Sequence, residues 1–136
     1  MDVALSIYFQ QFENGHEWSY SLAEIAAFYR GYHAIMTHWR NVLPLKIFDV
    51  PYEELIVNQE AITRALVDHC KLPWNDACLD HAQTSRLVGS ASNWQVRQPL
   101  YRSSLARWKN YERHLGELRE GLGNMLSPSD GVPADE

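Results

Sequence analysis

One long amphipathic segment constrains this chain of 136 residues more than any other feature. Between Leu22 and Leu43, apolar residues recur every three or four positions, which is the spacing of one face of an α-helix. Ser21 and Glu24 have the spacing of a capping box, which predicts where the helix begins. Pro44 predicts where it ends, because proline disfavours the helical conformation in the residue before it. The segment predicts a long helix whose apolar face packs against other elements.

Shorter elements are predicted on both sides of this helix. Val3–Phe12 is apolar on most sides and predicts a helix that needs several packing partners. Lys46–Val50 lies between two prolines and has the composition of a short strand. Further helical segments are predicted at 58–70, where Asn58 can cap the helix, and at 105–122, where Leu115, Leu118 and Leu122 form the apolar stripe, with a short turn at 77–81. No internal repeat is present.

Composition and charge narrow the class of protein. Apolar residues make up 46% of the chain and charged residues 21%, a balance typical of folded globular domains. The net charge of -5 argues against general attraction to nucleic acid. Two cysteines, Cys70 and Cys78, do not make a disulfide framework, so we expect a reducing, cytoplasmic location. We find no run of 18 apolar residues that would span a membrane and no secretory signal in the first residues.

One segment departs from the acidic character of the chain. From Arg86 to Tyr111 there are five basic residues and no Asp or Glu. Serine, asparagine and glutamine side chains, which can donate hydrogen bonds to an anion, lie between them. Since arginine presents a planar fork to phosphate, the segment predicts a site for a phosphorylated nucleotide. Two alternatives stay open: a solvated basic face paired with acids elsewhere in the chain, and a nucleic-acid groove, which the net charge disfavours.

Other combinations of reactive side chains are less specific. His69, Cys70, Cys78 and His81 do not have zinc-ligand spacing, because adjacent residues cannot easily share one tetrahedron. No His, Cys or Asp spacing favours a nucleophilic dyad. The aromatic side chains of the long helix are interpreted as core residues. The sequence therefore predicts no metal site and no catalytic residue of its own.

Several motifs together resemble those of PAPS-dependent sulfotransferases, where PAPS is 3'-phosphoadenosine 5'-phosphosulfate. The most specific is the run from Ser90 to Trp108, which is similar to the "T-x-S-x-x-Q-V-R-x-P-[IL]-Y-x-x-S-x-x-R-W" stretch of the protein-tyrosine sulfotransferase-like branch, including bacterial members linked to tetratricopeptide repeats. Four shorter motifs accompany it in the family's order: Asp2–Ser6 ("R-x-P-x-D-V-x-x-S"), His38–Trp39 ("M-x-H-W"), Tyr52–Leu55 ("YE-x-L") and Leu72–Trp74 ("G-L-P-W", with Lys71 in place of the glycine). The resemblance covers the chain from Asp2 to about Leu122.

The resemblance implies an α/β fold. It makes residues 1–126 the C-terminal part of a P-loop NTPase-like sulfotransferase domain, predominantly helical here with one or few short strands. Residues 127–136 are predicted to be a disordered tail. Because most strands of the sheet would lie upstream, we expect a truncated chain with exposed apolar faces through which it associates.

The implied activity is transfer of a sulfuryl group from PAPS to a hydroxyl, with protein tyrosine as the acceptor of the resembled branch. The sequence contains neither the family's 5'-phosphosulfate loop nor its catalytic base, so this chain alone is expected to be inactive. The implied partners are the nucleotide co-substrate and an acceptor peptide or small hydroxyl compound, without nucleic acid or a membrane span. The alternative is a non-enzymatic helical interaction module whose basic strip binds an acidic partner.

The resemblance also implies roles for individual residues. Ser6 would bond the 3'-phosphate of the cofactor, and Tyr52 would approach its adenosine part. A loop would cover the nucleotide with Ser92, Gln95, Val96, Arg97 and Tyr101. Arg107, together with Arg102, would supply positive charge to the phosphates. The arginine that usually accompanies the serine at position 6 would lie before Met1.

Overall fold

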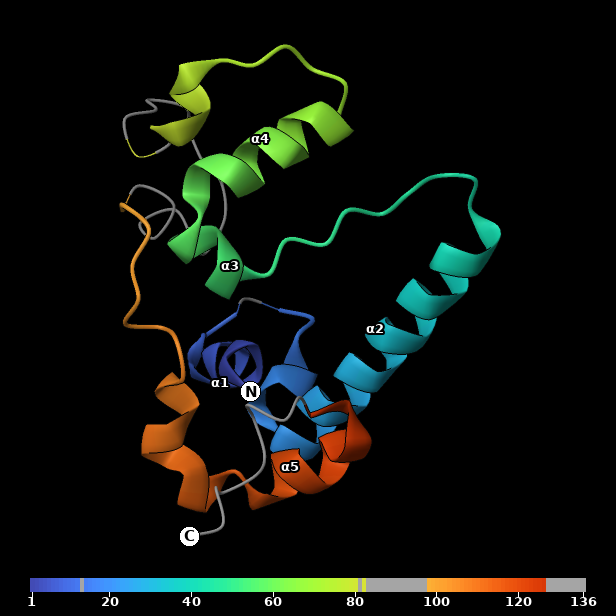
Figure 1. Cartoon of the computed structure of the whole chain (residues 1–136). Helices are drawn as coiled ribbons and strands as arrows, with labels where there is room; N and C mark the ends of the chain where they lie inside the picture. Colours follow the sequence, from blue (N-terminus) through green and yellow to red (C-terminus); the bar gives the residue numbers. More distant parts are fainter. Residues whose placement is uncertain (13, 81, 83–97, 127–136) are drawn as a thin grey trace, which may run out of the picture. The chain divides into compact units, whose positions relative to one another are not determined.

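The computed structural model describes residues 1–12, 14–80, 82 and 98–126, shown as coloured ribbon in Figure 1. The chain divides into two compact units. Unit 1 combines the two ends of the chain, Met1–Leu45 and Ala106–Glu136, and unit 2 is the middle, Lys46–Leu105. Each unit is described by itself.

Unit 1 is built from helices that come from both ends of the chain. The N-terminal part supplies α1 (Asp2–Phe9), the 3-10 helix η1 (Glu17–Tyr20) and α2 (Leu22–Val42). The C-terminal part supplies η5 (Arg107–His114), α5 (Gly116–Leu122) and η6 (Gly123–Met125). The predicted helix at 105–122 is therefore two elements, because the chain breaks at Leu115 between a 3-10 helix and an α-helix.

The core of unit 1 joins α1, α2, η5 and α5. Its buried apolar residues are Ala4, Leu5, Ile25, Ala26, Trp108, Leu115, Leu118 and Leu122. The predicted leucine stripe is thus confirmed as a core face. At Gly121 a Cβ would come within 2.5 Å of the Ala26 Cβ, so α2 and α5 approach closely at this point. The Arg30 guanidinium also donates a hydrogen bond to the Gly121 carbonyl.

The long helix confirms the sequence prediction at both ends. The Ser21 hydroxyl accepts a hydrogen bond from the Glu24 amide at 3.3 Å, and the backbone turns extended at Leu43, just before Pro44. The expectation that its aromatic side chains are core residues is wrong, since Tyr29, Tyr32 and Trp39 are all exposed. Helix α5 has seven residues and α2 has 21, so α5 can cover only about a third of the length of α2.

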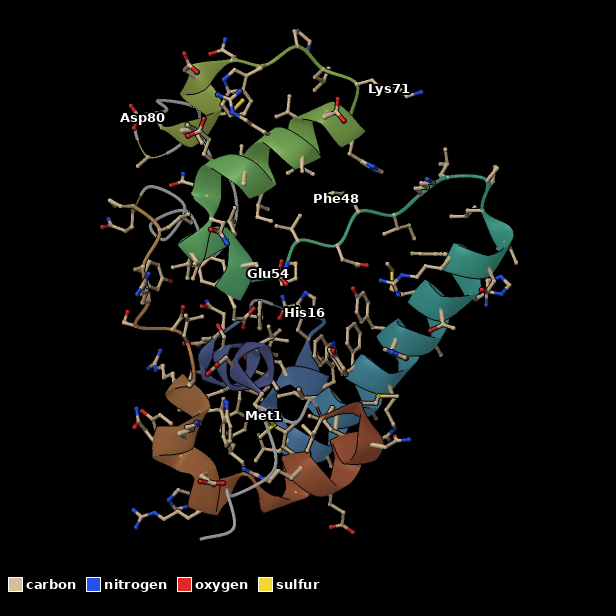
Figure 2. All side chains as sticks on the ribbon, viewed as in Figure 1. Met1, His16, Phe48, Glu54, Lys71 and Asp80 are labelled. Carbon is tan, nitrogen blue, oxygen red and sulfur yellow. The ribbon has the colours of Figure 1, made fainter. Side chains whose placement is uncertain are left out.

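Unit 2 contains α3 (Tyr52–Val57), α4 (Gln59–His69) and the 3-10 helix η2 (Asp76–Leu79). Helix α4 ends in a Schellman motif: Leu72 N–H donates to the Val67 carbonyl, and Lys71 N–H donates to the Asp68 carbonyl. Lys71 is left-handed, with φ of 55°, and its side chain points away from the ribbon in Figure 2. None of the unit 2 residues that the structure describes is fully buried.

The strand predicted at 46–50 is wrong. This segment has no regular secondary structure, and the part of the chain described here contains no strand. A β-strand needs a partner to bond its backbone groups, and the described residues provide none. Phe48 instead lies beside His69 of α4, with ring centroids 5.3 Å apart. The mostly helical fold is confirmed, whereas the P-loop NTPase-like architecture and the domain limits at 1–126 stay predictions, and the 127–136 tail lies outside the described residues.

Candidate functional site

One face of α1 carries the first residue of the predicted site. Asp2, Ser6 and Phe9 are spaced by four and three positions, so they share this face of the helix. Ser6 is exposed, whereas Ala4 and Leu5 of the same helix are buried in the core of unit 1. The core thus holds α1 in place and leaves the Ser6 hydroxyl available to a ligand.

Asp2 fastens this face of α1 to the start of η5. One oxygen of its carboxylate, Oδ2, accepts a hydrogen bond from the Ala106 amide at 2.7 Å. The other oxygen, Oδ1, accepts one from the Trp108 amide at 2.9 Å. The two bonds bracket Arg107, and Ala106 adopts a left-handed conformation with φ of 54°. The backbone on both sides of Arg107 is therefore fixed by one side chain of α1.

The Arg107 side chain lies over the next residue of the same face. Its guanidinium carbon is 5.6 Å from the centre of the Phe9 ring, within the range of a cation–π contact. The Phe9 ring also meets Tyr111 of η5 edge-on, with centroids 5.1 Å apart. Asp2 and Phe9 lie on either side of Ser6 along α1 and both contact η5. Ser6 and Arg107 therefore lie on the same side of unit 1.

A second pair of predicted residues comes together in unit 2. Tyr52, the first residue of α3, is half-buried, and its hydroxyl donates to the Tyr101 carbonyl at 3.3 Å. Arg102 follows directly and is exposed, with its own carbonyl accepting from the Leu105 amide. This contact joins the start of α3 to Tyr101 within unit 2. The remaining predicted residues, Ser92, Gln95, Val96 and Arg97, lie outside the described residues.

Sequence reasoning missed Asp2, Phe9 and Ala106 as parts of this arrangement. Asp2 was present in the resembled motif but had no role assigned to it. The four-residue spacing between Asp2 and Ser6 in a helical segment was a signal that both share a face. No sequence signal indicated that the Asp2 carboxylate would bond the backbone more than a hundred residues further along the chain.

The donor set around Ser6 and Arg107 suits a phosphate. A hydroxyl and a guanidinium both donate to anionic oxygens, and a guanidinium does so with two parallel bonds. In the part of the chain that the structure describes, no carboxylate forms an ion pair with Arg107. The described residues contain no group of three or more His, Cys, Asp and Glu that could hold a metal ion, and both cysteines are free and exposed.

Comparison with known proteins gives the family. Residues 1–76, more than half of the chain, match the Sulfotransferase family. The chain belongs to the Sulfotransferase family. The matched region of this sulfotransferase-family chain includes Ser6 and the motifs at 52–55 and 72–74. It ends before the 90–108 motif, so the family is confirmed while the tyrosine-specific branch stays a prediction.

One relative extends the similarity along nearly the whole chain. An uncharacterized protein of Aquifex aeolicus (strain VF5) is 36% identical over 135 residues, which cover 94% of this chain and 18% of the relative. The sulfotransferase-family chain therefore spans less than a fifth of that relative's length. No solved structure matches the chain. None of the described helices has both the length and the apolar character needed to cross a membrane.

Proposed function

We propose that this chain binds the 3'-phosphate of PAPS through Ser6 and Arg107 of unit 1, as part of a sulfotransferase. The observation that carries the proposal is the joint placement of the two residues. Ser6 lies between Asp2 and Phe9 on one face of α1, and both neighbours contact the segment that contains Arg107. Family membership supports a sulfuryl donor with this phosphate.

The residues on this face of unit 1 fit a phosphate ester by their chemistry. Arg107 is exposed, and its guanidinium is positioned over the Phe9 ring. The ring limits the directions that the guanidinium can take, which reduces the conformational entropy lost when it binds an anion. The Ser6 hydroxyl adds a second donor on the same side. PAPS would supply the sulfuryl group, and these two residues would bind and orient the nucleotide.

The proposal for unit 2, taken by itself, concerns Tyr52 and the residues near Tyr101. Tyr52 and Tyr101 were both predicted near the cofactor, and a hydrogen bond joins them. We assign Tyr52 to the adenosine part of the nucleotide and Arg102 to added positive charge. The acceptor would be a hydroxyl compound, with protein tyrosine favoured by the 90–108 motif. Reaction at the sulfuryl group would need a phosphosulfate loop and a base from outside these residues.

Calorimetric titration with 3'-phosphoadenosine 5'-phosphate tests the proposal. Each charge-assisted hydrogen bond contributes about 1.5–3 kcal/mol, so Arg107→Ala should weaken binding roughly 10- to 100-fold. Arg113→Ala is the matched control, because Arg113 is an exposed arginine of the same helix, bonded to His114. It should bind as the wild type does. Equal affinity of the wild type and Arg107→Ala would remove Arg107 from the site.

The alternative of a helical interaction module has less support. Of the five basic residues of its strip, Arg86 and Arg97 lie outside the described residues. The ion pairs Arg64–Glu60 and Arg119–Glu112 lie outside the strip. Association through exposed apolar faces stays a prediction. We therefore favour nucleotide binding over the interaction module.

A further inference from the structure

We propose that Asp2 is a positioning residue that sets the direction of the Arg107 side chain toward the phosphate. The inference rests on the proposed function and adds a residue to which the motif assigned no role. Asp2 does not need to touch the nucleotide. It acts through the backbone on both sides of Arg107, where its two carboxylate oxygens accept from Ala106 and Trp108.

The first step of the argument concerns Ala106. Its backbone is left-handed. This conformation is unfavourable in free energy for any residue other than glycine, and few such residues adopt it. Ala106 is exposed, so packing of its methyl group does not hold this conformation in place. The charge-assisted hydrogen bond from its amide to Asp2 Oδ2, at 2.7 Å, can stabilise Ala106 in this left-handed conformation.

The second step concerns the direction of Arg107. A left-handed residue reverses the local path of the chain, so the conformation of Ala106 decides on which side of η5 the next side chain emerges. With Trp108 buried and its amide bonded to Asp2, Arg107 is held at both ends. Its guanidinium then lies over Phe9, one helical turn beyond Ser6. Without Asp2, Arg107 would keep its charge but lose this direction.

The carboxylate of Asp2 could also act in a simpler way, as a negative charge near the phosphate. Its two oxygens, however, face backbone N–H groups, which offset its charge locally. The two roles predict opposite effects of Asp2→Asn. If Asp2 positions Arg107, the amide weakens phosphate binding, because it keeps one acceptor and presents a donor to the other N–H. If Asp2 only repels the phosphate, Asp2→Asn tightens binding.

The first test uses the full chain without nucleotide. A guanidinium side chain over the Phe9 ring should have its NMR signals shifted upfield by the ring, and Asp2→Ala should abolish that shift for Arg107. Glu117→Ala is the control, since it removes an exposed acid from the first turn of α5 and should leave the shift unchanged. Persistence of the Arg107 shift in Asp2→Ala would overturn the proposal. Circular dichroism of each variant confirms that it is folded.

The second test measures selectivity between two probes, 3'-phosphoadenosine 5'-phosphate and adenosine 5'-phosphate. A partly unfolded sample lowers the apparent binding of both probes alike. The dissociation constant of adenosine 5'-phosphate divided by that of 3'-phosphoadenosine 5'-phosphate is therefore a ratio that a general loss of structure does not change. We expect Asp2→Ala to lower this ratio about tenfold, and Asp2→Asn to lower it less. In the Asp2→Ala, Arg107→Ala double variant, the ratio should be no lower than in Arg107→Ala alone.

The outcomes separate this inference from the proposed function. Wild-type selectivity in Asp2→Ala, or tighter binding by Asp2→Asn, would overturn the role of Asp2 while leaving the phosphate site intact. If the wild type does not distinguish the two probes but Asp2→Ala abolishes the Arg107 shift, the proposed function is wrong. Asp2 would then still position Arg107, for a ligand other than a 3'-phosphate.

Discussion

The described parts of unit 1 and unit 2 are both helical but are stabilised in different ways. Unit 1 buries eight apolar residues, among them Ile25 and Leu118, whereas the described part of unit 2 buries none completely. The described contacts of unit 2 include the Schellman motif after α4 and the Arg64 guanidinium 3.9 Å from the centre of the Trp74 ring. The comparison teaches that unit 1 is better suited than unit 2 to hold side chains in a fixed geometry, because a buried core fixes the positions of its helices.

The largest expected effect is the loss of a core leucine. Leu118 is 0% exposed, and Leu118→Ala should lower the free energy of unfolding by about 3 kcal/mol through lost burial and a cavity. Leu66→Ala in α4 is the matched control, since Leu66 is 37% exposed and its truncation should cost less than about 1 kcal/mol. Urea unfolding followed by circular dichroism measures both. Equal losses of unfolding free energy in the two variants would contradict the conclusion that unit 1 has a buried core and the described part of unit 2 does not.

A smaller effect is expected where α2 and α5 approach most closely. Gly121→Ala would place a Cβ 2.5 Å from the Ala26 Cβ, which neither backbone can avoid without moving. We expect a loss of about 1–3 kcal/mol in stability. Gly116→Ala in the same helix is the control, because its Cβ would meet nothing within 4 Å, and it should be neutral or slightly stabilising. A neutral Gly121→Ala, measured by thermal unfolding, would show that the two helices are less tightly packed than the structure indicates.

The smallest expected effect sharpens the description of unit 2. Lys71 is left-handed at the end of α4, where glycine has no steric penalty. Lys71→Gly should therefore stabilise the end of α4 by about 0.5 kcal/mol, after part of the gain is offset by the greater entropy of unfolded glycine. Lys71→Ala, which keeps the steric penalty, should give no such gain. Hydrogen exchange of the α4 amides measures both variants, and a destabilising Lys71→Gly would contradict the role assigned to the turn.

The helices of unit 1 were predictable because their signals are local. Ser21, Glu24 and Pro44 mark the ends of α2 within a few residues, and Leu115, Leu118 and Leu122 mark one face by spacing alone. The exposure of Tyr32 and Trp39 was not predictable, because it depends on how far α5 reaches along α2. The strand predicted at 46–50 failed for a related reason: its composition was right, but pairing depends on another segment of the chain.

The candidate site was named by its residues in the sequence, and its role in binding stays a prediction. Ser6 and Arg107 were named from motifs, and the contacts of Asp2 and Phe9 place them on one side of unit 1. The hydrogen bonds that Asp2 makes to Ala106 and Trp108 join residues more than a hundred positions apart, which no local pattern reports. Lys71 is the opposite case, because a local motif pointed to this position. The resembled motif has glycine there, and the left-handed backbone of Lys71 explains why glycine suits the position.

The two-part construction of unit 1 has a consequence for synthesis of the protein. Helices α1 and α2 leave the ribosome with their apolar faces uncovered, and the helix that covers the start of α2 follows only after residues 46–105 have been made. Until then the nascent chain exposes an apolar surface that includes Ile25, and other nascent chains or a chaperone can bind this surface. During this interval of synthesis, Ser6 of α1 is present in the nascent chain without Arg107, which follows Leu105.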